Sequence, residues 1–207
     1  MSAFYSIHKA LTQSVVDLSL GVTIAHENVD FDPSDHFILG YDAQTVNFTV
    51  GLVITGATSG AVGTIVLDSD LGTTGTLTLN EITGAFENNE VITDSGSGSA
   101  TTDGTLSQIE QFIDLTDLPA SKTSLDKSLA DEATGFYQIS IYTKSGASVR
   151  SPIEIADTIM DFYKHNVKLV DGLQTVIIEN SNRNAGRNDN GWYIIDVSIE
   201  YRTNILR

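Results

Sequence analysis

The chain has 207 residues, 41% of them hydrophobic, a formal net charge of −16 and no cysteine. This composition suits a soluble globular protein of one or two domains, and the missing cysteine excludes disulfides, thiolate zinc sites and cysteine nucleophiles. No apolar run reaches the roughly 20 residues that cross a bilayer, and the amphipathic N-terminus does not resemble a signal peptide.

The first predicted element is an amphipathic helix near the N-terminus. Apolar residues recur there at three- and four-residue steps, and Ser2 can cap the helix start. The apolar stripe consists of Phe4, Ile7, Leu11, Val15 and Leu18. A short strand is expected over 22–25, and Pro33 with its aspartate neighbours predicts a turn after it.

The composition changes between Gly40 and Ser107, where the chain has no lysine, arginine or histidine. Short alternating runs such as FTVGLVI and GTLTLNEI are separated by turns rich in Gly, Ser and Asp. This pattern predicts a small all-β unit, either a barrel or a compact sandwich. FTVGLVITGATSGA resembles FENNEVITDSGSGSA, with Phe48 matching Phe86, and this weak echo suggests pseudo-symmetry within one unit.

The segments after residue 107 predict further strands. The stretch 111–118 is expected to form a strand that stops at Pro119, and the polar stretch 121–135 is expected to form a loop. The alternating residues 136–144 predict another strand.

The C-terminal third predicts one more helix and two strands. Ser151, Pro152 and Glu154 form a capping box, with proline at the first helical position, before a helical stripe. The strands are LQTVIIEN and GWYIIDVSIEYRT, joined by the loop SNRNAGRNDNG. On the last strand, Ile195 and Val197 belong to an apolar face that is expected to meet the helices.

Together these elements predict an α+β fold: a mostly antiparallel sheet with two helices packed on it, plus the small all-β domain. The α+β core is expected to be discontinuous, comprising residues 1–39 and 108–207. Residues 40–107 are expected to form the inserted domain, because a surface loop tolerates an insertion at a small loss of free energy.

The Gly-rich and acidic motifs give little evidence for a catalytic, phosphate-binding or metal-binding site. GSGSATTDG lacks the third glycine, the lysine and the following helix of a phosphate-binding loop, and GATSGA lacks the register of a nucleophile elbow. Asp32, Asp35 and His36 could lie near a metal, but no second histidine is close in sequence, which favours a polar loop. Asp68 and Asp70 match half of a calcium loop and are better explained as turn residues. We therefore expect no catalytic, cofactor-binding or metal-binding residues.

The charge distribution is more informative than the motifs. The net charge has two interpretations: solubility, or a surface that must not adhere to a polyanion passing close by. Arg183 and Arg187 share one loop that is predicted to be flexible. They are either solvated loop charges or contacts to an acidic neighbour, such as the next copy in a ring of identical subunits. These two arginines are the candidate interface residues.

Four stretches, taken in order, resemble the tail-terminator or minor tail proteins of long-tailed bacteriophages. They are VTIAHENVDFDP (22–33), QFIDLTDLPA (111–120), GFYQISIYTKSGASVRSPIEIADTIMDFY (135–163) and GRNDNGWYIIDVSIEYRT (186–203). The matches include the LPA motif, the Pro-capped helix with Asp157, and the GWY that opens the last strand. The block 40–107 departs from that family and resembles Gly/Thr-rich modules of virion and tail structural proteins.

The resemblance implies a structural virion protein, with no enzymatic activity and no cofactor, that acts as a tail terminator. Such proteins form a ring, usually a hexamer, at the head-proximal end of the tail tube, where they end tube growth and join the tail to the neck. The implied partners are other copies of the chain, the tail tube protein and a neck or head-completion protein. DNA would pass through the lumen without specific binding, no membrane would be involved, and assembly would take place in the host cytoplasm.

Two other functions remain open at the level of sequence. The chain could be a neck, connector or minor tail protein whose β domain is an exposed decoration, with glycan binding as one use. An enzyme or a carbohydrate-binding module would need a concave site with aromatic platforms. The aromatic residues of the inserted block are Tyr41, Phe48 and Phe86, and the two phenylalanines fit core positions better.

Overall fold

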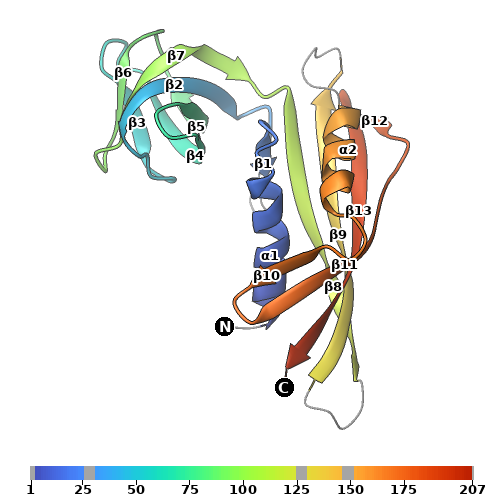
Figure 1. Ribbon diagram of the computed structural model, residues 1–207. Helices are drawn as coiled ribbons and strands as arrows, with labels where there is room; N and C mark the ends of the chain where they lie inside the picture. Colours follow the sequence, from blue (N-terminus) through green and yellow to red (C-terminus); the bar gives the residue numbers. More distant parts are fainter. Residues whose placement is uncertain (1–2, 26–30, 125–129, 146–151, 207) are drawn as a thin grey trace. The chain divides into compact units, whose positions relative to one another are not determined.

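A computed structural model describes residues 3–25, 31–124, 130–145 and 152–206 of the chain (Figure 1). The chain divides into two compact units, Met1–Val29 with Glu110–Arg207 (unit 1) and Asp30–Ile109 (unit 2). The expected insertion was 40–107. Unit 2 is larger because its first strand, β2, already begins at Phe37, before the composition changes.

Unit 1 is built on one seven-stranded sheet in the order β1-β8-β9-β13-β11-β10, with β12 pairing the start of β13, before the residues that pair with β11. Its strands are β1 (Thr23–Ala25), β8 (Gln111–Ser124), β9 (Ala130–Lys144), β10 (Lys168–Asp171), β11 (Gln174–Arg183), β12 (Arg187–Asp189) and β13 (Trp192–Leu206). All neighbouring strands are antiparallel except β1 and β8, which are parallel. Long central strands thus position the short strands at either side.

Two helices, α1 (Ala3–Asp17) and α2 (Pro152–Phe162), contribute to the core of unit 1. Ile7, Leu11 and Val15 of α1 are buried in one cluster with alternate residues of β9, β11 and β13. Ile195 and Val197 of β13 are fully buried in the same cluster, as their alternation predicts. The predicted cap residue Ser151 lies outside the described residues, and Phe4 of the predicted stripe is exposed.

The predicted stop at Pro119 and the predicted loop over 121–135 are wrong. Strand β8 continues to Ser124 and β9 begins at Ala130, so most of the polar stretch is strand. The pairing of β8 with β9 shifts between Leu118 and Ser121, which marks an irregularity at the proline. A proline is tolerated at such an irregularity on a strand with one free side, because no ladder hydrogen bond is needed from its nitrogen.

Unit 2 is a closed six-stranded barrel with the strand order β2-β5-β4-β3-β6-β7. Its strands are β2 (Phe37–Val46), β3 (Val53–Gly56), β4 (Val62–Asp70), β5 (Gly75–Thr83), β6 (Val91–Asp94) and β7 (Ser99–Gln108). Leu39, Ile54, Leu77 and Ile92 are fully buried inside it. Closure leaves the barrel without an open sheet edge, which suits short strands with glycine at their corners.

The barrel confirms the weak sequence echo as pseudo-two-fold symmetry. Where β2 pairs with β5, Leu39 lies opposite Leu77, and where β3 pairs with β6, Thr55 lies opposite Thr93. The partners in both pairs are 38 residues apart, the same spacing as Phe48 and Phe86, which are both buried. The pseudo-two-fold rotation exchanges residues that are 38 positions apart. Two such residues can lie directly opposite each other only where the rotation axis passes between them, so the axis passes through both pairs.

The predicted α+β class is wrong, because the structure is mostly β: a closed six-stranded barrel and a half-barrel sheet, with only two helices among the described residues. The prediction gave too much weight to two clear helical stripes. It also treated 121–135 as a loop and did not anticipate the short strands β10 and β12. A polar strand between other strands has no apolar alternation to reveal it, which is why the sequence understated the strand content.

Candidate functional site

The two candidate arginines lie on the free side of the sheet of unit 1, on either side of a short irregular segment. Arg183 is the last residue of β11 and pairs with Val197 of β13, and Arg187 begins β12 and pairs with Ile194. About half of the expected eleven-residue loop is therefore strand, with residues 184–186 between β11 and β12 and a turn at 190–191. Beyond Asp189, Asn190 and Gly191 have positive φ values of 46° and 85°, as a tight turn into β13 requires.

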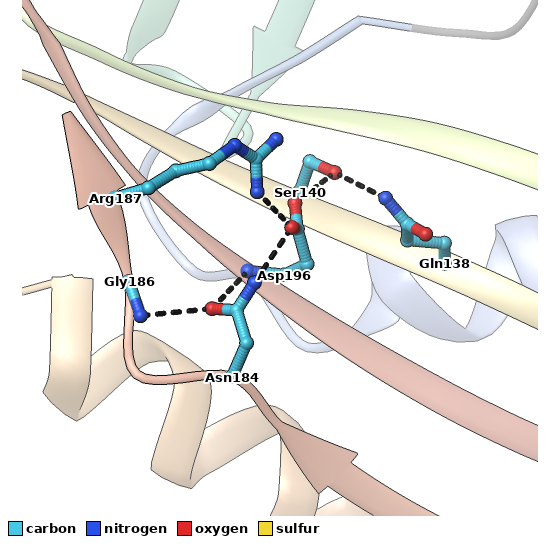
Figure 2. A network of polar contacts seen from close by, with 6 residues as sticks. All are labelled: Gln138, Ser140, Asn184, Gly186, Arg187 and Asp196. Atoms are coloured by element: carbon cyan, nitrogen blue, oxygen red, sulfur yellow. Dashed lines mark hydrogen bonds and ion pairs between the residues drawn. The ribbon is translucent and has the colours of Figure 1, made fainter. Parts of the chain in front are cut away.

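Asn184 fastens the interrupting segment to β13, as Figure 2 shows. Its Oδ1 accepts hydrogen bonds from the backbone N–H of Gly186 (3.0 Å) and of Asp196 (3.2 Å). Its Nδ2 donates to Oδ2 of Asp196 at 2.7 Å. A side chain that bonds the backbone two residues further on forms an Asx turn, which bends the chain locally. The oxygen and the nitrogen of the Asn184 side-chain amide thereby hold the segment in one conformation.

Gly186 allows the chain to pass close to Tyr193. Its φ is +79°, and a Cβ at this position would collide with the Tyr193 hydroxyl group. That hydroxyl group donates a hydrogen bond of 3.3 Å to the backbone oxygen of Ala185. Any larger residue at 186 would therefore displace the ring that covers the segment.

Asp196 is the centre of the polar network. Its side chain is 13% exposed and accepts hydrogen bonds from Ser140 on β9 at 2.8 Å and from Asn184. Gln138 donates to Ser140 at 3.1 Å, which extends the network along β9 (Figure 2). Arg187 forms an ion pair with the same carboxylate. A nearly buried carboxylate with several donors is well satisfied, so this network acts first to position the segment.

Arg183 is held differently. Its Nε lies 3.2 Å from Oδ1 of Asp157 on α2, and both side chains are substantially exposed. Exposed ion pairs contribute only about 0–1 kcal/mol. The guanidinium of Arg183 can therefore exchange Asp157 for another acidic partner at little loss, whereas that of Arg187 is tied to the network.

An aromatic cluster lies on the same face of the sheet as Asp196. Phe112 stacks on Tyr142 with ring centroids 4.5 Å apart, and Trp192 meets both rings edge-on. Burial, followed by the charges of Asp114 and Asp196, raises the pKa of Tyr142. This face thus combines aromatic rings, of which Tyr142 and Trp192 are partly exposed, with carboxylates, a composition suited to contact with another protein surface.

The acidic motifs singled out in the sequence have local structural partners. Asp32 accepts a hydrogen bond from the backbone of Ser34 at 2.8 Å, and Asp68 accepts one from the hydroxyl group of Tyr41 at 2.8 Å. Asp70 accepts from the backbone of Gly72 at 2.7 Å. Within the described part of the chain, no group of three or more His, Asp or Glu residues is placed to hold a metal ion.

The Gly-rich motifs form turns of the barrel, held by buried carboxylates. Glu90 accepts from the backbone N–H of Thr58 (3.1 Å) and Ser59 (3.0 Å), within GATSGA. Asp94 accepts from Gly96 (2.8 Å) and Gly98 (2.6 Å), within GSGSATTDG. The N–H groups that would face a phosphate in a nucleotide-binding loop are thus occupied by the protein's own carboxylates.

A groove of about 810 Å³ opens on unit 2. Its lining residues include three carboxylates, Asp32, Asp35 and Glu81, and one phenylalanine, Phe37. Sugar-binding sites use aromatic faces as platforms, and this lining is acidic rather than aromatic. The groove therefore gives little support to glycan binding.

Sequence reasoning found the two arginines but missed Asp196 and Asn184, the residues that fix their positions. Asn184-Ala185-Gly186 could have indicated the interruption, because Asn and Gly are both typical turn residues. Asp196 gave no such signal, since an acidic residue on the outward face of a strand is ordinary. Separately, no helix in the described ranges is both long and apolar enough to span a bilayer.

Comparison with known families supports the resemblance found in the sequence. Residues 110–201 match the family model described as phage tail terminator protein, a segment that runs from β8 to most of β13. No curated protein and no solved structure matches the chain. The family match supports a phage tail terminator family and hence a structural role in the phage tail, in association with other tail or neck proteins.

Proposed function

We propose that the chain is a tail terminator that forms a ring of identical subunits, typically six, at the head-proximal end of the tail tube. There it ends tube growth, joins the tail to the neck and performs no catalysis. The observation that carries this proposal is the family match over residues 110–201, which includes both arginines and the whole Asp196 network. The tail tube protein and a neck protein are the neighbours that such a position requires.

Charge supports a role around a DNA channel. The chain carries a net charge of −16, and its 11 lysines and arginines lie outside the segment 40–107. Tight DNA binding depends on cations that replace counterions on the phosphates. An acidic ring therefore lets DNA pass through its lumen without retaining it. The same charge opposes association of copies, so contacts between subunits should use the few available cations.

The segment from Arg183 to Arg187 is proposed to contribute one of these contacts. Arg183 is the member suited to reach an acidic neighbour, because its present partner Asp157 is exposed and easily exchanged. Arg187 contributes indirectly, because its ion pair with Asp196 helps to hold the segment in place. Charge-assisted hydrogen bonds from a guanidinium to a carboxylate are among the stronger surface contacts.

The role as terminator is tested by tail length. Particles assembled without this chain should carry tubes much longer than normal, measured by negative-stain electron microscopy. Tails of normal length that fail to join heads would instead support a neck or connector role. Restoration of normal length by the full chain supplied in trans is the necessary control.

The contact through Arg183 is tested by charge reversal. Arg183→Glu should weaken ring assembly, measured by sedimentation velocity, while the melting temperature of the subunit stays nearly unchanged. Lys164→Glu is the matched control, because Lys164 forms a similar exposed pair with Asp161 at 3.0 Å. Equal assembly of both variants with the parent chain would remove Arg183 from the contact.

A second candidate is a neck or minor tail protein with an exposed decoration domain. The observation that favours it is that unit 2, residues 30–109, lies outside the family match. If unit 2 is only a decoration, a chain lacking it should still assemble and support tails of normal length. Overlong tubes with that variant would tie unit 2 to termination itself.

A further inference from the structure

The hairpin between β10 and β11 ends in an unusually apolar tip. Asp171 pairs with Gln174, which leaves Gly172, with φ +60°, and Leu173 as a two-residue turn. Leu173 is 98% exposed and Val170 is 65% exposed. Small polar residues are preferred in tight turns, and an exposed leucine gains nothing from burial within its own chain. The tip is thus a projecting apolar knob.

The hairpin is fixed against α1, so the knob has a defined direction. Asp171 lies 2.9 Å from Nζ of Lys9, and its carboxylate also bonds Ser6, two residues of the first turns of α1. These hydrogen bonds lower the pKa of Asp171. Figure 1 shows the start of α1 beside the turn. A knob held by a helix loses less conformational entropy on binding than a free loop would lose.

The tip is not acidic, although the chain as a whole is. Lys168 is exposed and shares a strand face with Val170, and the charge of Asp171 is compensated by Lys9. The local charge is therefore positive, in a chain whose net charge is −16. The lysines of two such tips would repel each other, which disfavours pairing of a tip with its own counterpart across a two-fold axis.

A complementary surface lies on the two central strands of the same sheet, β9 and β13. Phe136 of β9 is 51% exposed, and it lies directly opposite Glu200 of β13 in the strand pairing. Residues directly opposite in an antiparallel pair point to the same face. An exposed ring beside a carboxylate can receive an apolar tip accompanied by a lysine. The donor and the acceptor surfaces are different, so their contact can be repeated head-to-tail from one copy to the next.

We propose that the β10–β11 tip of one copy docks on the Phe136–Glu200 surface of the next copy, with Leu173 and Val170 against the ring and Lys168 near Glu200. This inference rests on the proposed ring and names a contact that closes it. Head-to-tail contacts generate rings or filaments rather than two-fold dimers. One contact repeated around the ring therefore suffices, and it is independent of the segment at Arg183.

The decisive experiment is a charge swap in the full chain, with assembly followed by sedimentation velocity over a range of protein concentrations. Lys168→Glu and Glu200→Lys alone should each raise the concentration at which rings form by at least about tenfold. The double variant should restore most of the loss. Two single losses that simply add would overturn the pairing of these residues.

The apolar part is tested by Leu173→Glu, which should abolish ring formation at concentrations where the parent chain assembles. Leu71→Glu is the matched control, because Leu71 is also a turn leucine, 75% exposed, but lies in unit 2. Because the chain has no cysteine, Leu173→Cys combined with Phe136→Cys should give disulfide-linked ladders, and either single variant should not.

The outcomes separate the two proposals. Rings formed equally well by Leu173→Glu would overturn the docking contact and leave the terminator role intact. A parent chain that stays monomeric at every concentration, and also in assembled particles, would remove the ring itself. Loss of rings with Leu71→Glu as well would show that any added charge disrupts assembly, which also overturns the specific contact.

Discussion

Units 1 and 2 are both built mainly from antiparallel strands, but they differ in how the polar groups at the sheet edges and in the turns find partners. Unit 2 closes its sheet into a barrel and holds its turns with the buried carboxylates of Glu90 and Asp94. Unit 1 leaves its sheet open, and some of its cations pair with exposed acids, as Arg183 does with Asp157 and Lys164 with Asp161. Open strand edges and exchangeable ion pairs are what an assembling surface requires, whereas a closed barrel has neither.

This difference indicates in which unit the contacts with other copies should lie. Every strand of the barrel pairs with two other strands of the barrel, and its core is pseudo-symmetric. Its fold therefore requires no contact with another chain. Unit 1 contains an open sheet, an exposed apolar hairpin tip and paired cations. We therefore expect changes in unit 1 to alter assembly, and changes inside unit 2 to alter mainly the stability of the barrel.

The largest expected effect comes from removing one unit. Replacing residues 30–109 with a Gly/Ser linker of about 12 residues should leave a soluble, folded unit 1, because linkers of that length span roughly 20 Å. Circular dichroism and fluorescence of Trp192, the only tryptophan, provide the measurement. A collapsed or aggregated product would show that unit 1 depends on the barrel.

Truncation in the core of unit 1 should have the next largest effect. Ile195 is fully buried among β9, β11 and the helices, so Ile195→Ala should lower the free energy of unfolding of unit 1 by about 2–5 kcal/mol. Denaturant unfolding followed by Trp192 fluorescence measures the unfolding of unit 1, because Trp192 lies in that unit. Ser198→Ala, on the opposite face of β13, is the control and should change little. Equal losses would contradict the assignment of the two faces.

Glu90→Gln should destabilise the barrel by about 1–3 kcal/mol, because backbone N–H groups of the turn would lose a charged acceptor. Glu87→Gln is the matched control, since Glu87 is exposed and lies three residues away. Calorimetry detects the loss, while Trp192 fluorescence should show unit 1 unaffected. A loss confined to unit 1 would contradict the separation of the units.

The same residue predicts a dependence on pH. Burial alone would raise the pKa of Glu90, but hydrogen bonds from Ser59, Glu87 and Thr58 outweigh burial and lower the pKa below its ordinary value of 4.5. A lowered folded-state pKa contributes stability that is complete above the unfolded pKa and is lost as the pH falls through the folded pKa. The barrel should therefore lose stability below about pH 4.5, and Glu90→Gln should flatten that part of the profile.

Much of the fold could be read from the sequence where periodicity is strong. The stripes of both helices and the alternation along β13 gave correct elements, because burial on one face imposes the period. The parts of β8 and β9 beyond 111–118 and 136–144 were missed, because their sequence is mostly polar and shows no sustained apolar alternation. The register that makes the barrel symmetric was also invisible, since only pairing partners far apart in sequence define it.

The candidate site was predictable only in part. Arg183 and Arg187 stand out because cations are scarce in this chain. Asp196 and Asn184 do not stand out, since their roles depend on the hydrogen bonds that the folded sheet provides. Leu173 was predicted as part of a strand, and only the position of the turn shows that it is exposed.

The smallest expected effect tests the symmetry of the barrel. Ala43 and Glu81 are 38 residues apart and have left-handed φ values of 48° and 50°, next to irregularities in their strands. A left-handed conformation costs an L-residue about 1–2 kcal/mol, and a glycine loses about 0.5–1 kcal/mol more entropy on folding than alanine.

Ala43→Gly should therefore stabilise the barrel by up to about 1 kcal/mol. Glu81→Gly should stabilise it less, because it also loses an exposed hydrogen bond of 3.0 Å from Thr64. Calorimetry gives both values, and Ser107→Gly, at a strand position that has no positive φ itself, should have the opposite sign. Opposite signs at 43 and 81 would contradict their equivalence and leave only the strand pairing in support of the two-fold axis.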